Sequence, residues 1–222
     1  MTNLEKLKLL KLLYQHKSMG FEYFSDLKSI YHKRDLALPG SMDELKTIVT
    51  ACHMCSLSKT RKNVVFGDGN INADLMFVGE GPGANEDESG HVFVGRAGEL
   101  LSKIIENVFN LRRDDVYIAN IVKCRPPLNR VPNMDEVSAC KDFILQQIRI
   151  VNPKVLVALG STAFHHLTGD YETKISRVRG EVLKFGGIDL VPTFHPSFLL
   201  RNPSSKKEVF QDMLTVKRLL AL

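Results

Sequence analysis

Three apolar runs alternate with amphipathic segments along the chain, and this alternation restricts the possible folds more than any other feature. The runs 75–79, 115–122 and 154–160 are rich in apolar residues, as strands buried on both faces should be. Residues 96–109 and 134–151, which lie between them, have the apolar periodicity of helices. Alternating strands and helices predict an α/β fold, a three-layer α/β/α sandwich around a mostly parallel, roughly four-stranded sheet.

The rest of the chain continues the pattern. We expect a short helix over 161–167, one or two strands within 181–194 and a last helix over about 205–220. Ligands of parallel α/β sheets bind beyond the carboxyl ends of the strands. Functional residues are therefore expected in four segments, Gly79–Gly83, Asn120–Arg125, Gly160–Thr162 and Phe194–Pro196.

The first forty residues form a separate region of the sequence. They hold two stretches with helical periodicity, and Pro39-Gly40 then interrupts the pattern. Ser41 begins an S-x-x-E pattern, which predicts a capping box at the start of the next helix. We therefore divide the chain into an N-terminal helical extension, 1–40, and a main domain, 41–222. Packing on the core is the simplest role for the extension.

The composition suits one domain with a full core. The chain has 222 residues, of which 44% are hydrophobic and 25% charged, an ordinary soluble composition. No apolar run approaches the roughly 18 residues of a membrane span, and the start of the chain lacks a signal-cleavage pattern. We expect a cytoplasmic monomer without a membrane partner. The net charge of +5 fits a polyanionic partner such as nucleic acid.

The four cysteines are Cys52, Cys55, Cys124 and Cys140. A reducing cytosol disfavours disulfides, so these residues are either buried thiols or metal ligands. Their spacing is C-x2-C, a long gap and C-x15-C, whereas a structural zinc site usually brings a second close pair. By spacing alone they suit a zinc ion, an iron–sulfur cluster or unremarkable thiols.

The first strand end reads GEGPGANEDESG from residue 79. Gly79, Gly81 and Ala84 satisfy the G-x-G-x-x-A dinucleotide fingerprint. However, an acidic loop rather than a helix is expected to follow, and Glu80 would repel a pyrophosphate. A glycine-rich turn with solvated acids is the simpler explanation, but it leaves Phe93 and the glycine turn after it without a role.

The second strand end places Asn120 where the strand would direct its last side chains at the crevice. Such an Asn can cap the strand, or its amide can read the polar edge of a base, because it is both donor and acceptor. The following CRPPLNRVP holds three prolines and two arginines, Arg125 and Arg130. This composition suits a rigid, basic loop that touches phosphates.

The last strand end carries His195, followed by Pro196 and an apolar run that includes Leu199 and Leu200 and leads into Arg201. An apolar tip beside a cation suits a DNA wedge, which fills the space of an extruded base. The alternative is a helix-entry loop that packs its own apolar residues.

Taken together, these segments resemble the family 4 (iron–sulfur) uracil-DNA glycosylases. The resemblance rests on GEGPG with Glu86-Asp87, FVGRAGELL, YIANIVKCRPPLNRVP, VALGSTA and TFHPSFLLRNP, and it covers about residues 45–222. It implies an enzyme that hydrolyses the N-glycosidic bond of flipped-out uracil in single- or double-stranded DNA. The product would be an abasic site for base excision repair. It also implies a 4Fe–4S cluster held by the four cysteines.

The resemblance further implies a role for each strand end. Phe93 would stack on the uracil ring, Asn120 would bond its N3–H and O4 edge, and His195 would donate toward O2, where negative charge develops. The other residues that it implies are Glu80 and Gly81 lining the pocket, Glu86 near C5 of the ring, Asn129 near the base or the backbone, and Leu199, Leu200 and Arg201 as the wedge.

The group that activates water is left open by the sequence. Related family 1 enzymes have an Asp at the position of Gly81, and Glu80 is the candidate in this chain. An alternative function is a non-catalytic iron–sulfur DNA-binding or redox-sensing protein, but such a protein need not have kept Glu80, Asn120 and His195. A relative that bonds covalently to the abasic sugar would carry an Arg-rich insertion before the pocket His, which GGIDLVPTFHP lacks.

Overall fold

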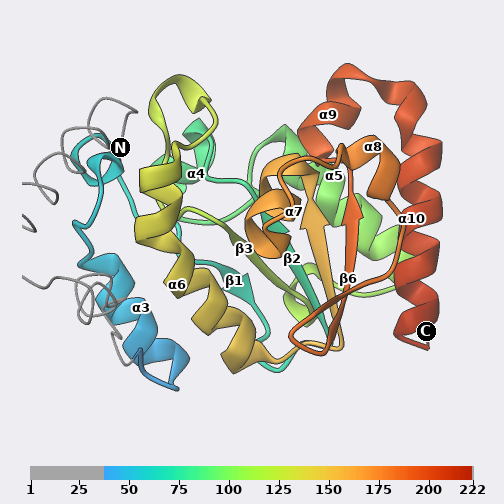
Figure 1. Ribbon diagram of the computed structural model, residues 1–222, viewed down its shortest axis with the longest axis horizontal. Coiled ribbons are helices and arrows are strands. Elements are labelled where there is room, and N and C mark those ends of the chain that lie inside the picture. Colours follow the sequence, from blue (N-terminus) through green and yellow to red (C-terminus); the bar gives the residue numbers. More distant parts are fainter. Residues whose placement is uncertain (1–37, 222) are drawn as a thin grey trace, which may run out of the picture. The chain divides into compact units, whose positions relative to one another are not determined.

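A six-stranded sheet forms the centre of the computed structural model, which describes residues 38–221 (Figure 1). Its strands are β1 (Asp68–Gly69), β2 (Leu75–Gly79), β3 (Tyr117–Asn120), β4 (Val155–Leu159), β5 (Leu183–Phe185) and β6 (Ile188–Thr193), in the order β1-β3-β2-β4-β6-β5. The four inner strands are parallel, and the two edge strands are antiparallel. The predicted mostly parallel sheet is confirmed. Short antiparallel edges extend it beyond the four strands expected.

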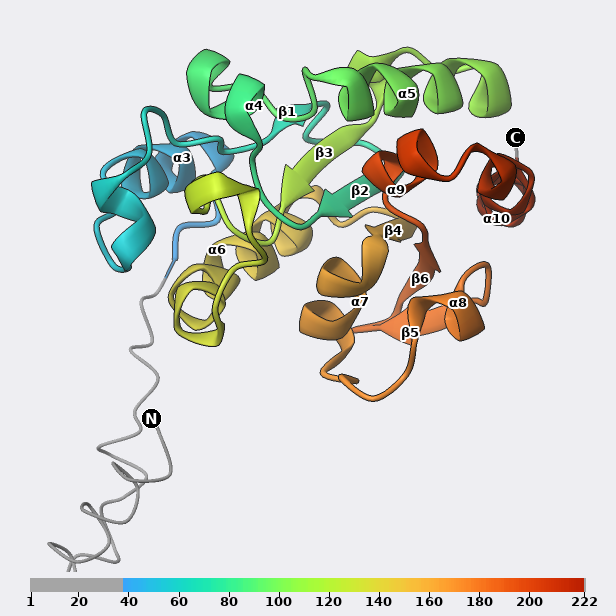
Figure 2. The ribbon, with the colours of Figure 1, turned by 90° about the horizontal axis from the view of Figure 1, so that it is seen from above.

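Helices cover both faces of the sheet, which confirms the three-layer sandwich (Figure 2). They are α3 (Met42–Thr50), α4 (Ala84–Ser89), α5 (Arg96–Ile104), α6 (Met134–Val151), α7 (Gly160–Thr168), α8 (Ile175–Val178), α9 (Pro196–Arg201) and α10 (Lys206–Leu219). Apolar residues of α5, α9 and α10 form one core with Phe77, Val157 and Val191 from the sheet. α6 and α7 lie across the opposite face. Within the described residues, no helix is both long and apolar enough to cross a membrane.

The register of the inner strands brings their carboxyl ends to one edge. Every residue of β2, β3 and β4 is buried, as their continuous apolar runs predict. Gly79 pairs with Asn120 across β2 and β3, and Leu159 pairs with Thr193 across β4 and β6. The segments that follow these four residues therefore meet at the same place.

Two local predictions differ from the structure. Ser41 precedes α3 as its N-cap, but its side chain makes no capping hydrogen bond. The acidic segment expected to be a loop after Gly83 is the short helix α4, because Glu86 accepts a hydrogen bond from the Gly83 N–H at 3.0 Å and caps it. The predicted helices of the extension 1–40 fall almost wholly outside the described residues.

Candidate active site

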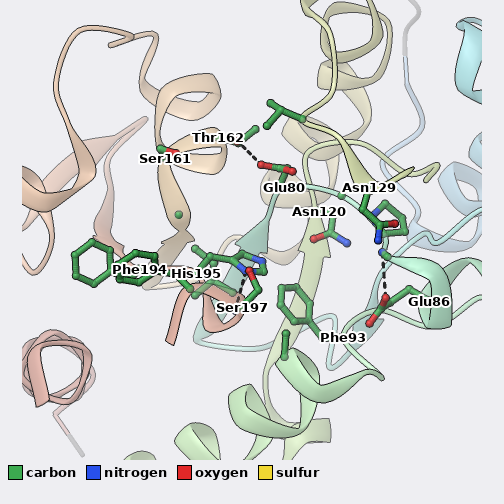
Figure 3. A pocket seen from close by; sticks show the side chains of 18 of the residues that line it. Glu80, Glu86, Phe93, Asn120, Asn129, Ser161, Thr162, Phe194, His195 and Ser197 are labelled. Atoms are coloured by element: carbon green, nitrogen blue, oxygen red, sulfur yellow. Dashed lines mark hydrogen bonds between the residues drawn. The ribbon is translucent and has the colours of Figure 1, made fainter. Parts of the chain in front are cut away.

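A pocket of about 560 Å³ opens at the carboxyl ends of the strands (Figure 3). Eight of the residues predicted for the site line it, namely Glu80, Gly81, Glu86, Phe93, Asn120, Asn129, His195 and Arg201. They come from β2, β3 and β6 or from the segments after them, so the predicted position at the strand ends is confirmed. The other two predicted residues, Leu199 and Leu200, do not line it.

Asn120 is the most distinctive residue of the pocket. Its side chain is 1% exposed, and its Oδ1 is the one buried side-chain oxygen or nitrogen of the described residues without a hydrogen-bond partner. A buried carbonyl oxygen left without a donor costs about 1–3 kcal/mol, so native structures seldom keep one without a reason. This acceptor is therefore available to an N–H donor in the pocket.

Gly79 allows Asn120 and Phe93 to pack closely against the end of β2. A Cβ added at Gly79 would overlap Asn120 Oδ1 and would lie 2.8 Å from Phe93 Cζ. No side chain fits there without displacing one of these two neighbours. The absence of a side chain at position 79 thus lets the Asn120 amide and the Phe93 ring lie next to the backbone of Gly79.

Phe93 forms one wall of the pocket. Its backbone has a φ of 48°, a conformation that costs a residue with a bulky side chain about 1 kcal/mol or more. The ring centroid lies 5.6 Å from that of His195, with 33° between the planes. Phe93, Asn120 and His195 thus line the same pocket (Figure 3).

Glu86 holds the loop that carries Phe93. One carboxylate oxygen accepts a hydrogen bond from the Gly83 N–H, and the other accepts from the N–H groups of Val94 and Gly95, each at 3.0 Å. The acid is thus bonded to the backbone on both sides of its own loop, which excludes the simpler explanation of a solvated loop acid. It also lines the pocket, where it was predicted to lie near C5 of the base.

His195 is neutral near pH 7. Burial is the larger cause, and together with the nearby Arg201 cation it lowers the pKa of His195 to about 4. Its Nδ1 accepts a hydrogen bond from the Ser197 N–H at 3.1 Å and lies 2.8 Å from Ser197 Oγ. Because Nδ1 is the acceptor, the network assigns the imidazole proton to Nε2, which becomes a hydrogen-bond donor.

Glu80 and Asn129 are fixed by partners of their own. Thr162 Oγ1 donates a hydrogen bond to Glu80 Oε2 from the first turn of α7. Arg125 Nε donates to Asn129 Oδ1 at 2.8 Å, and Asn129 itself has a φ of 55°. Both residues thus enter the pocket in defined orientations.

The structure corrects part of the predicted wedge. Leu199 is 1% exposed and packs in the core beneath the sheet edge, so it has no surface with which to enter DNA. Leu200 is 37% exposed, and Arg201 lines the pocket. The prediction is therefore wrong for Leu199, and the wedge narrows to Leu200 and Arg201.

The four cysteines line a second, smaller cavity. Cys52 and Cys55 follow α3, Cys124 follows β3, and Cys140 lies in α6. The guanidinium of Arg61 donates to Cys124 Sγ at 3.2 Å, and burial raises the pKa of Cys140 to about 12.

Among residues 38–221, no group of three or more His, Cys, Asp or Glu side chains converges on a position for a single metal ion. Thiolates that bind a cluster each hold a different iron and so need not converge. The four thiols that could hold a metal centre thus line one cavity, with the guanidinium of Arg61 beside Cys124.

Sequence reasoning missed three residues that support the site. Thr162 and Ser197 orient Glu80 and His195, and they lie in or directly after segments already singled out as strand ends. The fully buried Lys123 donates from Nζ to the backbone oxygen of Asn120 at 2.8 Å, and it directly precedes Cys124. Nothing in the sequence pattern distinguishes this lysine from a surface one.

Comparisons with known proteins agree with the geometry. The family model of the uracil DNA glycosylase superfamily matches residues 66–215. A type-4 uracil-DNA glycosylase of Thermotoga maritima is 46% identical over 179 residues, covering 79% of this chain and 93% of that protein. One of Sulfurisphaera tokodaii is 40% identical over 186 residues, covering 81% and 84%. A type-5 uracil-DNA glycosylase of Pyrobaculum aerophilum is 31% identical over 144 residues, covering 58% and 63%.

The chain has a pocket at the strand ends. Its matches to type-4 proteins extend over most of its own length and most of theirs. It therefore belongs to the uracil-DNA glycosylase superfamily and, within it, to the type-4 uracil-DNA glycosylases.

Proposed function

We propose that this chain hydrolyses the N-glycosidic bond of uracil flipped out of DNA, leaving an abasic site. The observation that carries the proposal is the unpartnered Asn120 Oδ1 in the pocket that Phe93 and His195 also line. Uracil offers what this pocket lacks, a flat ring with an N3–H donor beside the O4 acceptor. The Asn120 amide can accept from N3–H and donate to O4, whereas cytosine presents the opposite pattern.

His195 would act on the other side of the ring. As the glycosidic bond breaks, negative charge develops on the uracil and is shared by O2. A neutral imidazole with its proton on Nε2 can donate a hydrogen bond to that oxygen. No proton has to be transferred to the base before the glycosidic bond breaks. Loss of one donor of this kind typically costs about 2.7–4 kcal/mol of transition-state stabilisation.

Glu80 would act near the sugar. Its Oε2 accepts from Thr162, and no hydrogen bond to Oε1 is formed among the described residues. A carboxylate fixed in this way can orient a water molecule and stabilise positive charge on the sugar ring. The next residue, Gly81, has no side chain to supply an acid at the position where related family 1 enzymes have an Asp, so Glu80 is our candidate for this role.

Cys52, Cys55, Cys124 and Cys140 would hold a 4Fe–4S cluster. Such a cluster would tie together the segment after α3, the end of β3 and α6. Hydrolysis of a glycosidic bond requires no electron transfer, so we assign the cluster a structural role. The cytoplasmic location and the monomeric state expected from the sequence remain predictions, and no observation favours a non-catalytic function.

The test is incubation of the purified protein with a uracil-containing oligonucleotide, followed by alkali and separation by size. We expect cleavage at the uracil. Asn120→Asp should reduce it by about 100-fold or more, because an ionised carboxylate cannot donate to O4 and is costly to bury. DNA affinity, measured in parallel, should change little. Intact DNA with the unaltered protein would contradict the proposed function.

A further inference from the structure

The three most exposed large hydrophobic side chains of the described residues lie within seven positions of one another. They are Leu128, Val131 and Met134, at the tip of the proline-rich loop and the start of α6. Leu128 is 96% exposed, and no other exceeds 60%. Single exposed leucines are common, but a group of apolar residues beside a pocket marks a contact surface.

The loop holds Leu128 outward in a strained conformation. Its φ is 54°, in a region that non-glycine residues enter at a cost of about 1 kcal/mol. The N–H groups of Asn129 and Arg130 bond back to the carbonyl groups of Pro126 and Pro127 and close the turn. Strain of this kind is kept where the surrounding structure enforces it, and it is frequent at functional sites.

An ion pair fixes the loop to the body of the protein. Arg130 donates to both carboxylate oxygens of the buried Glu136, at 2.7 and 2.9 Å. Glu136 also accepts from the Asn133 N–H and from Ser56 Oγ, both at 2.8 Å. The hydrogen bonds from Arg130, together with those from Asn133 and Ser56, lower the pKa of Glu136 to about 2. The pair therefore stays charged. Arg130 therefore serves as an anchor, and its charge is neutralised within the protein.

The tip is continuous with the pocket. Asn129, Arg130 and Val131, the residues directly after Leu128, all line it. Arg201 and Phe198 of α9 line it as well, and in Figure 1 α9 and the segment before α6 both rise above the same edge of the sheet. The pocket is thus lined both by the segment that carries Leu128 and by α9, the helix that carries Leu200.

We propose that Leu128 is a second apolar probe, which packs into the base stack of duplex DNA beside the flipped uracil. The inference rests on the proposed function. Base faces are apolar and flat, and a single rigid leucine suits insertion between them better than it suits a protein interface, which needs a far larger area. Arg125 at the base of the loop and Arg201 across the pocket supply the positive charge that the neighbouring phosphates require.

The test compares Leu128→Asn with Leu128→Met. Asn adopts a positive φ readily and so preserves the turn while it removes the apolar tip, and Met keeps an apolar tip. The matched control is Ile71→Asn, an equally polar change at an exposed position before β2, at the opposite end of the strands. Three substrates are used. They are a uracil-containing oligonucleotide as a single strand, the same oligonucleotide in a duplex, and that duplex with 2-aminopurine beside the uracil.

For Leu128→Asn we expect about a tenfold loss of single-turnover excision from the duplex and less than about twofold from the single strand. The 2-aminopurine fluorescence should fall together with excision from the duplex. Leu128→Met and Ile71→Asn should resemble the unaltered protein in both measurements. The slope of log affinity against log salt should not change, because no charge is removed.

Equal excision from the duplex by Leu128→Asn and the unaltered protein would overturn the inference, as would equal losses on both substrates or a changed salt slope. Dissociation of a dimer on substitution, seen by sedimentation, would assign the tip to a second copy of the chain and overturn it too. None of these results concerns excision from the single strand by the unaltered protein. Failure of the unaltered protein to excise uracil from the single strand would instead refute the proposed function.

Discussion

Gly79 and Asn120 are paired at the ends of β2 and β3, and the missing side chain of the first lets the amide of the second lie against its backbone. A Cβ at position 79 would press on both Asn120 Oδ1 and Phe93 Cζ. We expect Gly79→Ala to fold, because its backbone does not need a positive φ. It should lower uracil excision by about 100-fold or more by displacing the Asn120 amide and the Phe93 ring.

Inhibition by free uracil is the measurement that checks this assignment. Gly79→Ala should no longer be inhibited by free uracil, while its affinity for undamaged DNA stays unchanged. The control is Gly40→Ala, where an added Cβ meets no neighbour. Undiminished inhibition in Gly79→Ala would show that the base binds elsewhere.

The lowered pKa of His195 predicts how folding stability depends on pH. Its pKa is lowered in the fold to about 4 from an ordinary value of 6.5, so the unfolded chain binds more protons between these two values. Folding stability should therefore fall as the pH is lowered from about 6.5 to 4 and should be insensitive to His195 above pH 7. Urea unfolding of the unaltered protein and of His195→Gln should diverge in that acidic window alone. Parallel curves over pH 4–7 would contradict the neutral imidazole.

Glu86 should act through the loop that it holds. Glu86→Gln replaces an acceptor oxygen by an NH₂ group, which must face either the Gly83 N–H or the N–H groups of Val94 and Gly95. We expect about a tenfold loss of uracil excision from this mismatch. Glu86→Ala, which also frees space near C5, should gain weak excision of thymine, measured on a T·G duplex. Unchanged uracil turnover in both variants would remove Glu86 from the site.

Substitutions at the neighbouring residues Leu199 and Leu200 should have different effects, on stability at Leu199 and on excision from duplex DNA at Leu200. Leu199→Ala leaves a cavity in the core and should lower the free energy of unfolding by about 2–5 kcal/mol. Leu200→Ala should unfold like the unaltered protein but excise uracil more slowly from a duplex than from a single strand, which has no base pair to open. Urea denaturation and excision assays on both variants check this; a destabilised Leu200→Ala would contradict it.

The cysteine cavity predicts a brown protein with a broad absorption near about 400 nm and about four irons per chain. Cys124→Ser should lose iron and stability, because Cys124 and Cys140 would tie the end of β3 to α6 through the proposed cluster. In the fraction that stays folded, single-turnover excision should change far less. A colourless, fully active protein with one zinc ion would contradict the assignment.

The layers and the place of the site could be predicted from local patterns in the sequence. Strands such as 75–79 and 155–159 and the helix 134–151 follow from local periodicity, and the parallel sheet then brings the strand ends together. Residue type and position made Asn120, His195 and the cysteines candidates, and their proposed roles came from the resemblance to a known family.

The contacts of each side chain depend on the folded structure and could not be predicted from the sequence. Arg130 reads as a phosphate ligand in the sequence, yet it is bonded to Glu136, and Leu199 reads like Leu200, yet it is buried. Glu80 meets Thr162 across 82 positions of the chain. Burial and hydrogen-bond partners arise from segments distant in sequence, and no local pattern records them. The acceptor of Asn120 left without a partner is therefore a property of the assembled fold.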